Sequence, residues 1–129
     1  MRDVRKLKDE AAEAAAKGRH RKAAEIYADL TRIEPNDPLW PHRAGEAFRR
    51  AGATSDAITQ LAVAAEGYAK QGFLLKAISV AKMILEIDPG RGEAQAMLAS
   101  LYARRDHSDS ARLPGVPLPP AARPVRPPP

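Results

Sequence analysis

Side chains that could perform acid–base, nucleophilic or metal chemistry are few in this sequence and widely spaced. The histidines stand at positions 20, 42 and 107, and no two have the i,i+4 spacing that places two imidazoles on one helix face. No cysteine is present, so thiolate metal ligands and disulfides are excluded. Carboxylate pairs such as Asp9/Glu13 and Glu86/Asp88 are typical of solvated helix faces. The sequence therefore predicts no catalytic residue, no metal site and no cofactor.

The elements that would have to position any site are helices. Helical periodicity is continuous from about residue 3 to residue 106, punctuated by Gly and Pro, and no strand pattern is present. It predicts six helices, at about 3–17, 20–34, 38–51, 54–71, 74–87 and 92–105. Asp3, Asp37 and either Thr54 or Ser55 are the expected N-caps. The short links between them predict antiparallel helix pairs.

Composition divides the chain near residue 107. Prolines number four before this position and eight after it. We therefore expect a helical domain over residues 3–106 and a disordered or polyproline-II tail, or a linker, over residues 107–129. No apolar stretch approaches the roughly 20 residues that span a bilayer, and no apolar signal segment follows the N-terminus. A cytoplasmic protein is the expectation, with no membrane partner.

The amino-acid composition limits which kinds of fold this chain can form. Apolar residues make up 44% of the chain but aromatic ones only 5%, and alanine dominates. Small residues let helices approach closely while burying little area each, which favours an elongated stack over a globule. The net charge of +5 is spread among both signs, so it argues only weakly for a nucleic-acid partner.

Glycine and alanine recur at fixed offsets. Gly18 and Gly52 lie 34 residues apart, and each is followed five residues later by an alanine, Ala23 or Ala57. A third glycine at position 72 has the same offset to an alanine at position 77. The glycine allows a helix pair to reverse at positive φ, and the alanine suits a close helix crossing. A repeat of paired helices is therefore predicted.

This pattern resembles the tetratricopeptide repeat (TPR) family. The residues that match fall into three units: Gly45, Phe48, Gly52 and Ala57; Tyr68, Gly72, Ala77 and Pro89; and Leu98, Ala99 and Tyr102. The resemblance covers residues 4–106 and implies an all-α, TPR-like α-solenoid that acts as a non-enzymatic protein-interaction scaffold or adaptor. The interval from Gly52 to Gly72 is 20 residues instead of 34, so the fourth helix is expected to close one unit and open the next.

The resemblance also implies where a partner would bind. In the family, the first helix of each pair lines a concave groove. The corresponding positions here are His42, Arg43, Glu46, Arg49, Arg50, Ala62, Glu66, Lys70, Ser100 and Arg104. The excess of basic groups predicts an acidic protein or peptide segment as the ligand.

Two other predicted surfaces suggest alternative functions. The sixth helix has a terminal hydrophobic face, formed by Met97, Leu101 and Tyr102, with no following helix to cover it. That face predicts self-association, as a homo-oligomerisation module of a larger regulatory protein of bacterial type. Weak nucleic-acid binding is the other alternative, through a basic edge formed by Arg19, Arg21, Lys22, Arg49 and Arg50.

Overall fold

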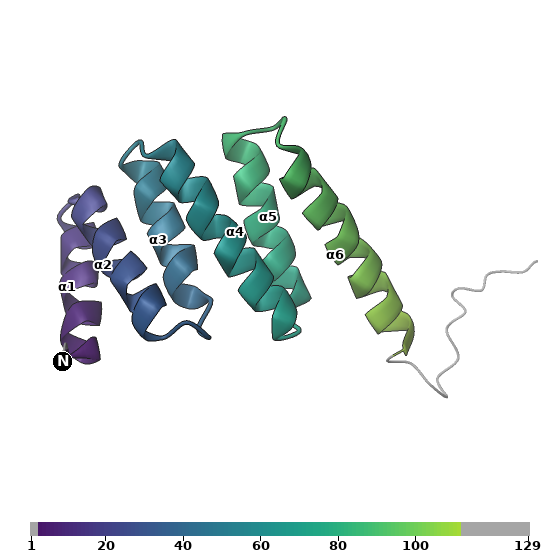
Figure 1. Ribbon diagram of the computed structural model, residues 1–129, viewed down its shortest axis with the longest axis horizontal. Helices are drawn as coiled ribbons and strands as arrows, with labels where there is room; N and C mark the ends of the chain where they lie inside the picture. Colours follow the sequence, from purple (N-terminus) through teal and green to yellow (C-terminus); the bar gives the residue numbers. More distant parts are fainter. Residues whose placement is uncertain (1–2, 112–129) are drawn as a thin grey trace, which may run out of the picture.

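Helices are the regular elements of residues 3–111, the part of the chain that the computed structural model describes. In chain order they are α1 (Val4–Ala16), α2 (His20–Ile33), α3 (Leu39–Arg50), α4 (Thr54–Lys70), α5 (Leu74–Ile87) and α6 (Gly92–Ala111). Each helix packs mainly against the next one in the chain, and the six lie side by side in sequence order with alternating direction (Figure 1). This confirms the predicted all-α solenoid of six antiparallel helices.

Helix starts follow the expected capping residues in two of three cases. The carboxylate of Asp3 accepts a hydrogen bond from the Arg5 amide at 3.0 Å, and that of Asp37 accepts one from the Leu39 amide at 3.0 Å. The predicted cap of α4 by Thr54 or Ser55 is wrong, because α4 starts directly after Ala53 without a side-chain cap. The turn at Gly52 determines instead the direction in which the chain enters α4.

Three turns share one glycine geometry. Gly18, Gly52 and Gly72 have φ of 78°, 81° and 84°. The amide after each glycine donates to the carbonyl five residues earlier, at 2.8 to 2.9 Å. This is a Schellman motif, in which the left-handed residue costs glycine little. The turns that follow α2 and α5, each with a proline, have no positive-φ residue.

The order of these turns shows a break in the repeat. Glycine turns follow α1, α3 and α4, and proline-containing turns follow α2 and α5. A strictly alternating repeat would place a proline turn after α4. Two glycine turns thus follow in succession, before and after α4, as the 20-residue interval between Gly52 and Gly72 predicts.

Alternate helices form two layers. The ammonium of Lys8 on α1 lies 5.0 Å from the ring centroid of Trp40 on α3, and Arg49 on α3 pairs with Glu86 on α5 at 3.2 Å. Helices α1, α3 and α5 therefore share one layer. On the other side, the guanidinium of Arg104 on α6 donates to a backbone carbonyl of α4 at 3.1 Å. Helices α2, α4 and α6 make up the second layer.

The core is built from small residues at the helix crossings. Ala23, Ala57 and Ala77, the alanines of the repeat, are all fully buried. A Cβ placed on Gly45 would lie 2.6 Å from the side chain of Leu61, so only glycine allows α3 and α4 to cross this closely. The buried residues form two clusters that meet within α4, one ending at Ala57 and the other beginning at the next residue.

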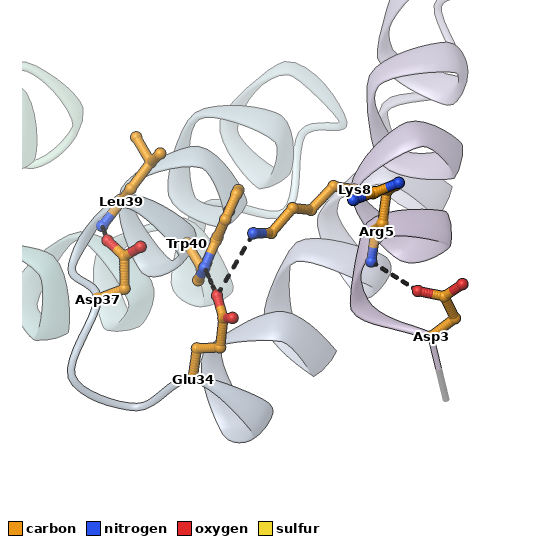
Figure 2. A network of polar contacts seen from close by, with 7 residues as sticks. All are labelled: Asp3, Arg5, Lys8, Glu34, Asp37, Leu39 and Trp40. Carbon is orange, nitrogen blue, oxygen red and sulfur yellow. Dashed lines mark hydrogen bonds and ion pairs between the residues drawn. The ribbon is translucent and has the colours of Figure 1, made fainter. Parts of the chain in front are cut away.

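Trp40 organises the first of these clusters. Its indole stacks on Tyr27 with ring centroids 6.1 Å apart, and only 7% of the residue is exposed. The indole N–H donates to the Glu34 carboxylate at 2.7 Å, and Lys8 approaches the same carboxylate to 3.8 Å (Figure 2). The buried donor is therefore satisfied where α1, α2 and α3 meet.

The last helix is longer than predicted. We expected it to end at about residue 105, whereas α6 continues to Ala111. Residues 107–111, assigned from composition to the tail, are therefore helical, because the prolines that prevent helix formation begin only at Pro114. The remainder of the predicted Pro-rich tail lies outside the described residues.

Candidate functional site

A small cavity opens between α1, α2 and α3. It measures about 190 Å³ and its lining includes Arg43, Glu46 and Arg50, three of the predicted partner-binding residues. Ala15, His20, Tyr27 and Ala47 complete the lining. The guanidinium groups of Arg43 and Arg50 form no ion pair within residues 3–107. We call this site the α1–α3 cavity. It presents two uncompensated cations beside an aromatic wall.

His42 is turned toward α4, away from this cavity. Its Nδ1 lies 2.9 Å from the Tyr68 hydroxyl, and its Nε2 lies 3.6 Å from the Glu46 carboxylate. Burial lowers the pKa of His42 below its ordinary value of 6.5; Glu46 opposes this shift, and Arg43 and Lys76 add to it. Burial also raises the pKa of Tyr68. His42 thus joins α3 to α4, and Tyr68 is a partner that sequence reasoning did not identify.

The basic edge is partly neutralised within the chain. Arg49 pairs with Glu86 of α5 at 3.2 Å, and Arg21 lies 3.9 Å from Glu25 one turn along α2. Arg49 therefore connects two helices of one layer and does not line the α1–α3 cavity. The structure separates it from Arg50, its neighbour in the predicted set.

A second group of predicted residues meets in a groove between α4 and α6. One cavity there, of about 360 Å³, is lined by Ala62 and Glu66 of α4 and by Met97 of α6, among others. A second cavity, of about 400 Å³, is lined by Ala103, Arg104 and His107 of α6, Gly72 of the α4–α5 turn and Leu74 of α5. Ser100 is exposed and lies between Met97 and Arg104 on α6, at helical spacing. We call this surface the α4/α6 groove.

The predicted set is therefore divided between two surfaces. Residues of α3 contribute to the layer of odd-numbered helices, whereas those of α4 and α6 contribute to the other layer. The shared role expected of α4 explains the division, because the first helix of a pair changes layer at this point. Lys70, exposed at the end of α4, belongs with the second set by its helix.

The structure buries part of the terminal hydrophobic face that was predicted on α6. Leu101 is only 3% exposed, and Met97 and Tyr102 are half-buried against α5 and α4. Lys82 and Arg105 also cover the Tyr102 ring, with the cationic groups 5.8 and 5.4 Å from its centroid. Leu101 is buried in the core because a terminal helix still packs one apolar stripe against its neighbour.

Exposed apolar side chains are found elsewhere. Phe73 and Leu75, at the start of α5, are 51% and 66% exposed. The Lys76 ammonium lies 5.4 Å from the Phe73 ring centroid and 5.7 Å from that of Tyr68. These residues were not among those predicted from the sequence, although an apolar run directly after a glycine turn was a visible signal.

Within the described residues, no group of three or more His, Asp or Glu side chains could hold a metal ion.

None of the helices in the described part of the chain is long and apolar enough to cross a membrane.

This chain is similar in fold to solved structures of helical proteins. No protein-family model and no curated protein matches this chain. A solved structure of the first TPR of Spaghetti (RPAP3), bound to an HSP90 peptide, is similar over 80% of this chain and 95% of that chain. The two sequences are 17% identical and the TM-score is 0.44. A likeness of this size carries no argument about function.

Proposed function

We propose that this chain is a non-enzymatic protein-interaction module that binds an acidic segment of a partner in the α1–α3 cavity. The observation that carries the proposal is the position of Arg43 and Arg50, which line one cavity without forming an ion pair in the described part of the chain. An arginine binds a carboxylate through two parallel hydrogen bonds, so two such groups in one cavity select for clustered carboxylates.

The surroundings of the two arginines support a peptide ligand. Tyr27 also lines the cavity, but it is 7% exposed and stacked on Trp40, so it supports the site from the core and leaves the exposed arginines to contact the ligand. Glu46 is the only acidic residue in the lining and lies beside His42, at the edge facing α4.

Binding of a fluorescein-labelled glutamate-rich peptide, followed by fluorescence anisotropy, tests the proposal. A version with glutamine at every glutamate keeps the size and removes the charge. We expect the acidic peptide to bind and the glutamine version to bind at least about tenfold more weakly, which is about 1.4 kcal/mol. Substitution of both arginines, Arg43→Gln and Arg50→Gln, should cause a loss of similar size.

The matched control is the double variant Arg19→Gln/Arg21→Gln, which removes the same charge from the start of α2 and the residue before it, at positions that do not line the cavity. It should keep the affinity of the unmodified chain. Equal losses in both double variants would mean that only overall charge attracts the peptide, and the cavity would then have no specific role. Equal binding of both peptides would also contradict the proposal.

A further inference from the structure

Two cavities lie along the α4/α6 groove, and the guanidinium of Arg104 crosses it to the Ala69 carbonyl of α4. Five residues of α6, three or four positions apart, follow one face of the helix along it: Glu93, Met97, Ser100, Arg104 and His107. Both cavities of the groove lie on this line, one toward each end of the helix. Residues of α5 contribute apolar side chains to both, Ile84 to one and Leu74 to the other.

Charge differs between the two ends of this groove. Toward the start of α6, Glu66 forms no ion pair within the described residues. Arg91, in the same cavity, is shared by the carboxylates of Asp88 at 3.5 Å and Glu93 at 3.9 Å, which leaves carboxylates in excess. Toward the other end, the basic groups Lys70 and Arg104 follow. A segment that runs from the end of α6 toward its start would match the groove if it were apolar and uncharged near the end of α6 and basic near the start.

The sequence that follows α6 has this composition. Residues 112–129 contain three arginines and no acidic residue, and the stretch from 113 to 122 carries no charge. Its large apolar side chains, Leu113, Val116 and Leu118, precede Arg123 and Arg126. We propose that this segment of the same chain binds in the α4/α6 groove antiparallel to α6, with its apolar residues along the groove and Arg123 near Glu66 and Glu93.

The length of the segment is sufficient for this path. At about 1.5 Å per helical residue, Met97 lies roughly 21 Å and Glu93 roughly 27 Å along α6 from Ala111. A proline-rich chain in the polyproline-II conformation advances about 3.1 Å per residue, so Arg123 can reach roughly 37 Å from Ala111. This exceeds the distance to Glu93 by about 10 Å, which allows for the reversal of the chain after Ala111.

Binding of the segment would not depend on the ligand of the α1–α3 cavity. The two surfaces share no lining residue. The α4/α6 groove would be occupied within the chain, so a partner would have to displace residues 112–129 to enter it. The inference therefore stands or falls separately from the proposed function.

Paramagnetic broadening in the full chain tests the proposal. The chain has no cysteine, so Ala122→Cys gives a single site for a nitroxide spin label. We expect the label to reduce the backbone amide intensities of Ala62, Glu66 and Met97, as well as those near the end of α6. Broadening restricted to the last turn of α6 would overturn the proposal.

Two comparisons separate specific binding in cis from its alternatives. The variant Glu66→Lys should restore the intensities near Ala62 and Met97, whereas Glu10→Lys, an equal charge change on α1, should leave them reduced. A mixture of spin-labelled chain with isotope-labelled, unmodified chain should show no broadening. If the mixture is broadened as strongly as the single chain, the occupant is a second copy and the proposal in cis is wrong. Equal effects of both lysine variants would also overturn it.

Discussion

His42 of α3 and Tyr68 of α4 form a polar contact between these two neighbouring helices. The imidazole Nδ1 lies 2.9 Å from the phenolic oxygen, and the two rings meet edge to face with centroids 5.7 Å apart. Tyr68 is 5% exposed and His42 is half-buried. The contact holds α3 against the end of α4, directly before the glycine turn at Gly72.

The stability of the protein should depend on pH through His42. Its pKa in the folded chain is below 6.5, chiefly because of burial, so below pH 6.5 the unfolded chain binds the proton more readily than the folded chain. The contribution of His42 is fully present above pH 6.5, and the free energy of unfolding falls as the pH drops through the folded-state pKa. Urea midpoints at about pH 7.5 and about pH 5 measure this loss.

Carboxylates also titrate in this range, so the comparison requires variants. We expect His42→Gln to show a smaller decrease in the urea midpoint between the two pH values than the unmodified chain. The control His20→Gln, which leaves the His42–Tyr68 contact intact, should keep the full decrease. An unchanged pH dependence in His42→Gln would show that other groups are responsible.

Gly45→Ala should destabilise the fold by overpacking. The added Cβ would lie 2.6 Å from two atoms of Leu61 and 3.2 Å from the Ala57 carbonyl oxygen, so α3 and α4 would have to move apart. We expect a loss of about 1–3 kcal/mol in the free energy of unfolding, measured by urea denaturation. In Gly92→Ala, where the new Cβ meets nothing within 4 Å, stability should stay the same or rise. Equal effects at both positions would contradict the close helix crossing.

Gly72→Ala should cost about 1–2 kcal/mol for a different reason. A Cβ at this position meets nothing within 4 Å, but φ is +84°, a conformation that disfavours alanine. Gly72→Asn should cost less, since asparagine tolerates the left-handed region better. Thermal unfolding of the two variants provides the measurement, with Gly52→Ala as a reference turn of the same geometry. A Gly72→Ala protein as stable as the unmodified chain would argue against a second consecutive glycine turn.

Trp40 is the only tryptophan and should report on the first core cluster. Because it is 7% exposed and its N–H is bonded to Glu34, its fluorescence should be shifted to the blue and protected from acrylamide in the folded chain. Trp40→Ala should cost about 3–5 kcal/mol in the free energy of unfolding. Lys8→Ala, which removes the partly exposed cation over the ring and its ion pair with Glu34, should cost less than about 1 kcal/mol. A quencher-accessible Trp40 in the folded chain would contradict this packing.

The helices and their turns could be predicted from the sequence because the signals are local. Glycine at positions 18, 52 and 72 and the prolines that follow α2 and α5 act through the conformation of their own backbone, whatever lies around them. The buried alanines followed at fixed offsets from the glycines. The interval between Gly52 and Gly72 was sufficient to predict two successive glycine turns, before and after α4.

Which side chains share a surface was decided only by the tertiary structure. Offsets along single helices placed Arg43, Glu66 and Arg104 in one groove, but the change of layer at α4 puts the first in the α1–α3 cavity and the others in the α4/α6 groove. The burial of Leu101 and the turn of His42 toward Tyr68 likewise depend on how neighbouring helices pack. Local sequence determines where a helix begins and ends, whereas the exposure of each face depends on contacts between residues far apart in the chain.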